Sequence, residues 1–248
     1  MKQSVKSIAK LVQYDLVIFF REPFFALPIL LLPGFFFVVY ASAFGKAPAD
    51  RISFGQYIPT YMLLISYLTV FFQIGTQYVT DKQNGIFKRL LLSPIRLLHV
   101  VISYSIRGVL VSVLGFFEMT VLAGAVLRIP LSENMLRVFF VFLLLASIMM
   151  LLSISIHGFI KNAKNVMLFS ILCFQYVFFS TGMIMPVEKM PAAVRFFVYL
   201  NPIYHMNQVL VSAWYQTRQS AEHVLALAAW VILCLLFVRL QKGFATDK

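Results

Sequence analysis

The sequence predicts an all-α membrane protein with six transmembrane helices, an N-terminal amphipathic helix at the membrane surface, and short re-entrant helices between the fifth and sixth spans. Hydrophobic residues make up 61% of the 248 residues and charged residues only 12%, whereas a soluble domain carries about 25% charged residues. Apolar runs of about 20 residues, the length that crosses the hydrocarbon core, recur along the chain. The polar segments between them are short, so residues 1–248 are predicted to form a single membrane domain.

Six apolar runs are predicted to span the membrane. In chain order they are Phe24–Phe44, Phe54–Val79, Gly108–Leu127, Val138–Ile160, Asn165–Val187 and His223–Val238. Pro28 and Pro33 are expected to kink the first span. The sixth run is short, and Arg239 and Lys242 can lengthen it by extending their side chains to the interface.

The distribution of Lys and Arg predicts the orientation. If the N-terminus lies in the cytoplasm, the segments on that side carry nearly twice as many Lys and Arg residues as those on the other side. Cytoplasmic loops are enriched in these residues, so both termini are predicted to lie on the cytoplasmic side of the membrane. The net charge of +12 then reflects topology and attraction to anionic membrane lipids, and no nucleic-acid partner is expected.

Residues 1–23 are predicted to form an interfacial helix before the first span. Their apolar members recur at helical spacing: Val5, Ile8, Leu11, Val12 and Phe19. This pattern is typical of an amphipathic helix that lies on the inner leaflet. The alternative is a basic tail that only sets the topology.

Residues 186–216, between the fifth and sixth spans, are predicted to form two short extracellular helices. Each half is too short to cross a bilayer. Pro191 suits a first helical position, and Asn201 followed by Pro202 is typical of a capped helix start; Pro186 marks the beginning of the segment. The helices are expected to be re-entrant or to lie on the membrane, and the alternative is a plain surface loop.

The segment 81–96, DKQNGIFKRLLLSPIR, is basic and lies between two apolar runs. It is too polar for lipid, yet it contains Ile, Phe and Leu residues, which favours a cytoplasmic docking element. The chain has no G-x-x-x-x-G-K-[ST] sequence, so it is not expected to bind ATP through a phosphate loop of its own.

Polar residues inside the spans are candidates for a substrate path, because such residues are functional candidates by default. Glu118 lies in the middle of the third span and must find a partner on another helix, face water or be protonated. Arg107 lies about 16 Å earlier along the same helix, too far for direct pairing. Gln73 and Gln77 are similar polar candidates. For all of them a hydrogen bond between helices is an equally good explanation.

No metal site is expected. The four histidines, His99, His157, His205 and His223, are far apart and lack the spacing of metal ligands. Cys173 and Cys234 lie in predicted spans and are expected to be free thiols.

The order of several motifs resembles the ABC transporter type-2 permease family, the membrane subunits of many bacterial exporters. A basic amphipathic N-terminus leads through Arg21-Glu22-Pro23 into a proline-broken span. Asp81 to Leu90 is similar to the family's E-x-x-x-G-T-x-x-x-L segment, with Asp81 and Ile86 in place of the commoner Glu and Thr.

Further motifs follow in the family's order. Ser93-Pro94 stands where the family usually has S-P. Nearer the C-terminus, Thr181-Gly182 through Met185-Pro186, then Met190-Pro191 and Leu200-Asn201-Pro202, resemble the family's S-G…P…P…N-P stretch. The similarity covers essentially the whole chain.

The resemblance implies transport powered by a separate chain. Permeases of this family usually pair with a second copy or a related subunit, and each pair works with two copies of an ATPase subunit. ATP and Mg²⁺ would bind to the ATPase, and no cofactor to this chain. The segment 81–96 would be the coupling helix that enters a groove on the ATPase. The residues implied in this role are Asp81, Gly85, Ile86, Phe87, Lys88, Arg89, Leu90, Ser93 and Pro94.

The residue types suit this role. Gly85 allows a tight turn, and Ile86, Phe87 and Leu90 could supply an apolar knob. The basic residues Lys88 and Arg89 could meet acidic residues of the partner.

By analogy with the family, the expected function is efflux of a lipophilic or amphipathic compound such as an antibiotic. Export of polysaccharide, teichoic acid or another lipid-linked cargo is the alternative. A membrane enzyme that modifies lipid is a remote alternative, because it would need clustered carboxylates or histidines. Asp50, Glu133, Glu188 and Glu222 are instead scattered over three connections, so the chain is expected to be a transport subunit and not an enzyme.

Overall fold

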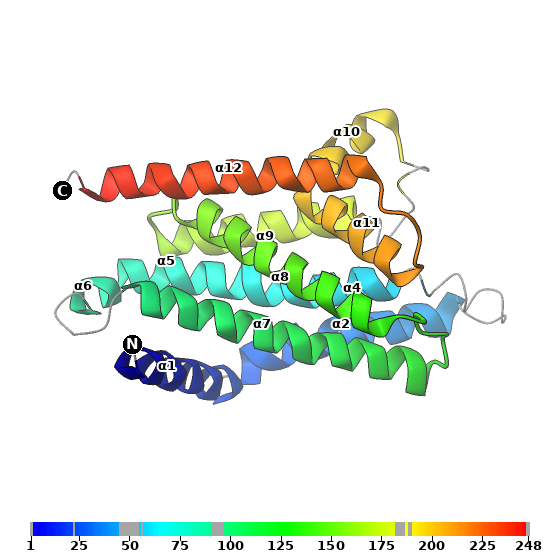
Figure 1. The fold of residues 1–248 in the computed structure, drawn as a ribbon, viewed down its shortest axis with the longest axis horizontal. Coiled ribbons are helices and arrows are strands. Elements are labelled where there is room, and N and C mark those ends of the chain that lie inside the picture. Colours follow the sequence, from blue (N-terminus) through cyan, green and yellow to red (C-terminus); the bar gives the residue numbers. More distant parts are fainter. Residues whose placement is uncertain are drawn as a thin grey trace.

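The computed structural model describes residues 2–21, 23–44, 55, 57–90, 97–181, 187 and 190–246. These residues form an elongated bundle of helices, and none of them belongs to a strand (Figure 1). The all-α prediction is therefore confirmed.

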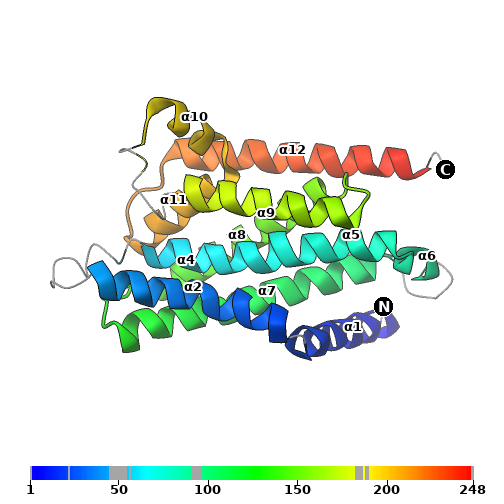
Figure 2. The same cartoon turned by 180° about the vertical axis from the view of Figure 1, so that it is seen from behind.

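Five helical stretches are long and apolar enough to cross a membrane: Tyr57–Gln83, His99–Val126, Met135–His157, Ala163–Ser180 and Ala221–Gln241. A sixth candidate is a bent pair, in which α1 (Lys2–Arg21) and α2 (Pro23–Phe44) meet at an angle of 66°. With 22 residues, α2 is about 33 Å long and runs along the bundle beside α4 (Figure 2). We count it as the first span.

The second span is divided into α4 (Tyr57–Ser66), the π-helical segment η1 (Tyr67–Ile74) and α5 (Gly75–Gln83). The third span consists of α7 (Leu97–Val121) and the π-helical η2 (Leu122–Val126). The remaining spans are α8 (Met135–His157), α9 (Ala163–Ser180) and α12 (Ala221–Thr246). Three shorter helices connect them: α6 (Ile86–Leu90), α10 (Ala192–Leu200) and α11 (Pro202–Trp214).

Two predicted boundaries are wrong. The third span does not begin at Gly108, because the helix already runs from Leu97 and packs along α1. The fifth span does not reach Val187, because α9 ends at Ser180, with Thr181 as its C-terminal cap.

The two ends of the bundle carry different short helices. Both chain termini and α6 lie at one end, which we call the α6 end, and α10 and α11 lie at the opposite, α11 end (Figures 1 and 2). Placement of both termini at one end agrees with an even number of spans.

The second span forms the centre of the bundle and contacts α7, α8 and α11. Its residues from Ile58 to Tyr67 are all buried. By contrast, α9 and α12 expose large apolar side chains along their length, among them Leu172, Phe179, Leu225 and Ile232. Exposed apolar surface of this extent is typical of contact with lipid or with another membrane subunit.

The predicted helices after the fifth span are present. α10 follows Pro191, and α11 begins at Pro202. Asn201 caps α11, since its Oδ1 accepts a hydrogen bond from the Ile203 N–H at 2.9 Å. α11 is buried among α4, α8, α9 and α12, so a plain surface loop is excluded for it. Pro186 lies outside the described residues.

The predicted N-terminal helix is also present as α1, so a purely unstructured basic tail is excluded for Lys2–Arg21. α1 packs along α7. Phe19 is buried in a cluster with Val111 of α7, while Tyr14 and Phe20 are exposed. One face of α1 thus belongs to the bundle, and the other is available to lipid.

Candidate functional site

A tight turn at Asn84 and Gly85 joins α5 to α6. Gly85 has a φ of +71°, in the left-handed region that favours glycine. The Asn84 N–H donates to the Thr80 carbonyl at 2.9 Å and closes α5, and the Arg89 N–H donates to the Gly85 carbonyl at 3.0 Å and begins α6. The sharp turn predicted at Gly85 is present.

The side chains of α6 divide between an exposed face and a packed face. Ile86 and Arg89 are exposed. The Phe87 ring instead packs on Tyr78 of α5, with ring centroids 5.3 Å apart. Phe87 therefore anchors α6 to α5 while remaining half-buried, and its part in an apolar docking knob stays a prediction.

Other residues of the predicted docking segment lie beyond the described part. The side chains of Lys88 and Leu90 and the whole of Ser93 and Pro94 are in this group. Asp81 is described, and it does not belong to the surface of α6: its carboxylate accepts a hydrogen bond from the Tyr104 hydroxyl of α7.

A buried polar cluster lies between α5 and α7 near the α6 end. Arg107 is only 2% exposed. Its Nη2 donates to Gln77 Oε1 of α5 at 2.7 Å, and its guanidinium carbon lies 5.4 Å from the centroid of the Tyr104 ring, within the range of a cation–π contact. Tyr104 also binds Asp81. Two contacts therefore hold α5, the helix before α6 in the chain, against α7, the helix after it.

The same cluster reaches the N-terminal helix. Ser103 Oγ of α7 donates to Asp15 Oδ2 of α1 at 2.5 Å. Arg107 interacts electrostatically with both Asp15 and Asp81. The hydrogen bonds from Ser103 to Asp15, from Tyr104 to Asp81 and from Arg107 to Gln77 together fix how α1, α5 and α7 sit against one another. We call Asp15, Gln77, Asp81, Ser103, Tyr104 and Arg107 the Arg107 cluster.

A second set of contacts ties the end of α5 to the turn between α8 and α9. Lys82 Nζ donates to the Gly158 carbonyl at 3.3 Å, and Gln83 Oε1 accepts from the Ala163 N–H at 2.5 Å. Gln241 of α12 donates to the Ser155 carbonyl of α8 at 2.7 Å. The last turn of α5 is thus held from two sides, by the Arg107 cluster and by the α8–α9 turn.

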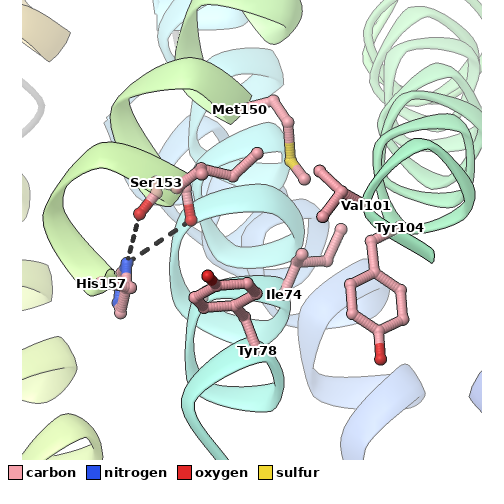
Figure 3. A pocket seen from close by; sticks show the side chains of 9 residues that line it. Ile74, Tyr78, Val101, Tyr104, Met150, Ser153 and His157 are labelled. Carbon is pink, nitrogen blue, oxygen red and sulfur yellow. Dashed lines mark hydrogen bonds between the residues drawn. The ribbon is translucent and has the colours of Figure 1, made fainter. Parts of the chain in front are cut away.

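Between these two sets of contacts lies a cavity of about 10 Å³, lined by side chains of α5, α7 and α8 (Figure 3). His157 borders it and is fully buried. Its Nδ1 donates to the Ser153 carbonyl at 2.9 Å, and its Nε2 lies 3.3 Å from the Ser170 hydroxyl, which can donate to it. Both ring nitrogens are used in the neutral state, so His157 joins α8 to α9 as a structural residue.

The sequence matches a known family over most of its length. The family model described as ABC-2 type transporter matches residues 7–215. The chain belongs to the ABC-2 type transporter family. It is accordingly a membrane subunit of an ABC transporter and a multi-pass membrane protein. No curated protein matches the chain.

The three residues predicted to line a substrate path are not brought together in this transporter subunit. Gln77 belongs to the Arg107 cluster. Gln73 lies one turn earlier in the π-helical segment, and its Oε1 is buried without a hydrogen-bond partner among the described residues. Glu118 lies on another helix, where its Oε1 is packed against Gly34 of α2.

At the α11 end, the transporter subunit holds α11 against its neighbours through several hydrogen bonds. Asn201 Nδ2 donates to Ser180 Oγ of α9 at 2.6 Å. Thr60 Oγ1 of α4 donates to Asn207 Oδ1 at 2.9 Å, and Asn207 Nδ2 donates to the Thr181 carbonyl at 3.3 Å. The second span therefore contacts α6 at one end and α11 at the other.

Three residues of the Arg107 cluster were not singled out from the sequence, namely Asp15, Ser103 and Tyr104, and the pairing of Arg107 with Gln77 was not predicted. Asp15 is the only acidic residue in α1, and Arg107 is the only basic residue in the third span of the transporter. Because each is the single charge of its sign in its helix, Asp15 and Arg107 could have been predicted from the sequence to lie near each other. Ser103 and Tyr104 gave no such signal, because their roles depend on how α7 is rotated.

The part of the transporter that the structure describes contains no group of three or more His, Cys, Asp or Glu side chains that could hold a metal ion. Cys173 and Cys234 are both free thiols.

Proposed function

We propose that this chain is the permease subunit of an ATP-driven exporter in a bacterial cytoplasmic membrane, with the α6 end in the cytoplasm. A separate ABC ATPase, present in two copies, binds ATP and Mg²⁺ and docks on α6. One observation carries the proposal most directly: the turn before α6 ends a helix, α5, whose last two turns are hydrogen-bonded to α7, to the turn after α8 and to the start of α9.

The docking surface consists of the outward face of α6. Ile86 offers an apolar contact, and Arg89 offers a positive charge to acidic residues of the ATPase. Phe87 and Tyr78 connect this face to α5. Displacement of α6 by the ATPase would therefore move α5 instead of bending a flexible loop.

The second span transmits this movement along the bundle. α5 is tied to α7 through Arg107, and α4, at the far end of the same span, is tied to α11 through Thr60. Between them lies the π-helical segment Tyr67–Ile74. Such segments are rare and occur frequently at functional sites. A shift of the second span would thus reach both ends of the bundle.

The transport path forms between two permease chains in this proposal. The cavity between α5, α7 and α8 is about 10 Å³, whereas sites for drug-sized ligands are about 300–1,000 Å³. The apolar faces of α9 and α2 are exposed and could meet a second copy or a related subunit.

The cargo is a lipophilic or amphipathic compound, in line with spans rich in Phe and Met.

The proposal is tested by purifying the full-length chain together with an ABC ATPase from the same cells and measuring ATP-dependent uptake of lipophilic dyes, charged and neutral, into inside-out vesicles. Retention of the ATPase and dye uptake that stops when ATP is withheld are expected. A chain that purifies without an ATPase and moves no dye would overturn the proposal.

A further inference from the structure

α1 has two faces of different character. The residues that face the bundle recur at helical spacing: Val12 and Phe19 are buried, and Asp15 between them is half-buried. Residues at the same spacing on the opposite side form a stripe that is exposed throughout: Lys10, Tyr14, Val17 and Arg21. We call it the outer stripe of α1. Asp15 is the only acidic residue of α1, so the outer stripe has a positive charge at each end and no negative charge.

The outer stripe suits the surface of a membrane. α1 meets α2, the first span, at an angle of 66°, so it turns away from the direction in which the chain crosses the bilayer. Beyond Arg21 the exposed surface continues along α2, where Leu27 and Leu31 are exposed, so the stripe borders the part of the bundle that lies within the bilayer. Basic residues with a Tyr between them are typical of a helix at the level of the lipid headgroups. Because the stripe carries positive charge alone, it favours anionic phospholipids.

The bundle-facing side of α1 is linked to the helix that precedes α6. Ser103 Oγ of α7 donates to Asp15 Oδ2 at 2.5 Å. The next residue of α7, Tyr104, donates to Asp81 in the last turn of α5. Two hydrogen bonds and a single turn of α7 thus separate α1 from the turn that leads into α6. α1 also packs along α7, so a change in how firmly α1 is held on α7 would reach the docking helix.

From this arrangement we propose that α1 is a lipid-responsive regulator of coupling. Anionic phospholipid of the inner leaflet binds the outer stripe through Lys10 and Arg21 and holds α1 against α7. The hydrogen bonds at Asp15 and Asp81 then keep α5 and α6 in the position from which α6 responds to the ATPase. This role rests on the proposed function for the orientation and the ATPase, whereas lipid binding by the outer stripe is a property of this chain alone.

The lipid preference is measured on the purified full-length chain in phosphatidylcholine bilayers, by electron spin resonance of spin-labelled phosphatidylglycerol and phosphatidylcholine. The wild type should retain the anionic lipid in preference to the zwitterionic one. The double variant Lys10→Gln, Arg21→Gln should lower that preference severalfold. The matched control, Lys161→Gln with Lys164→Gln, removes the same charge from two exposed positions after α8 and should keep it. The absence of a preference in the wild type, or an equal loss in both double variants, would overturn the proposed lipid site.

The regulatory role is measured with the permease–ATPase complex in liposomes with and without phosphatidylglycerol. Dye transport per ATP hydrolysed should be severalfold higher with the anionic lipid. Ser103→Ala removes the donor to Asp15, and it should keep the lipid preference but lose this dependence of transport on the lipid. Ser105→Ala, which removes a hydroxyl that bonds to the Val101 carbonyl of the same helix at 2.8 Å, should respond like the wild type.

Two results would contradict the regulatory role: equal coupling of the wild type in both kinds of liposome, or the same response to the lipid in the Ser103 and Ser105 variants. A lipid preference without any ATP-driven transport would contradict the proposed export function and leave the lipid site standing.

Discussion

Arg107 of α7, which is only 2% exposed, donates a hydrogen bond of 2.7 Å to the half-buried Gln77 of α5. The bond joins the helix that precedes α6 to the helix that follows it. Since Tyr104 and Asp81 make a second contact between the same helices, the two sides of the docking segment are held together. A displacement of α6 is therefore expected to move α5 and α7 together.

Removal of the guanidinium should destabilise the protein strongly. Arg107→Met removes the charged hydrogen bond to Gln77 and takes a positive charge away from the half-buried Asp15 and Asp81, and loss of a hydrogen bond to a charged group costs about 1.5–3 kcal/mol. Gln77→Leu leaves Arg107 without one acceptor and should cost about 1–3 kcal/mol. Thermal and denaturant unfolding in detergent micelles measure both effects. Arg137→Met, at an exposed position, is the control, and equal stability of the two Arg variants would contradict the role of the cluster.

Substitutions at Gly85 should affect coupling in a defined order. No atom lies within 4 Å of a Cβ built at this position, so the effect of a side chain is backbone strain alone. Asn tolerates the left-handed region, Ala occupies it at a cost of roughly 1–2 kcal/mol, and Pro cannot adopt a positive φ. Transport per ATP hydrolysed should fall from Gly to Asn, then Ala, then Pro, with insertion into the membrane retained. Equal coupling in the Ala and Pro variants would count against the turn as the transmitting element.

The exposed face of α6 should decide whether the ATPase binds. Ile86→Asp places a charge on the apolar contact, and Arg89→Glu reverses the charge. Each should reduce copurification of the ATPase severalfold without lowering the unfolding temperature of the permease, because neither side chain is buried. Lys161→Glu, in the exposed turn between α8 and α9, makes the same charge change at the same end of the bundle. If it releases the ATPase equally, general charge and not α6 governs docking.

Local signals in the sequence were sufficient for much of this fold. The start of α11 followed from Asn201 and Pro202, since a capping side chain and a proline at the first helical position act within a single turn. The turn at Gly85 followed likewise from glycine's tolerance of positive φ. The apolar runs indicated the spans because lipid demands a minimum length.

Contacts between helices could not be predicted from the sequence, because they depend on how each helix is rotated about its axis. The packing of Phe87 on Tyr78 was not predicted, because the pattern of a five-residue helix does not show which of its side chains contact the preceding helix. Gln77 was taken with Glu118 as part of a path, although the two lie on different helices and Gln77 binds Arg107. A polar residue in a span predicts a partner but does not identify it.

Close packing of α5 on α8 should make Gly75 intolerant of any side chain. A Cβ at this position would lie 2.4 Å from His157 Cε1, and the ring cannot retreat because Ser153 and Ser170 hold both nitrogens. Gly75→Ala should therefore lower the free energy of unfolding by about 1–3 kcal/mol. In Gly124→Ala the nearest atom is a flexible Leu131 methyl at 3.1 Å, and the loss should be much smaller. A second change, His157→Ser, should partly restore stability to Gly75→Ala; absence of any rescue would contradict the steric explanation.

The bond between Thr60 and Asn207 should matter more for transport than for stability. Thr60→Val keeps the shape of the side chain and removes the donor that joins α4 to α11; hydrogen bonds between membrane helices contribute only about 0.6 kcal/mol on average. If the second span passes the movement of α6 on to α11, this variant should hydrolyse ATP normally and transport less per ATP. Thr120→Val is the matched control, because the Thr120 hydroxyl bonds only to the Phe116 carbonyl of its own helix at 2.8 Å. Equal transport by the two variants, measured in the same vesicles, would mean that the movement reaches α11 through other contacts, such as those of α8 or α12.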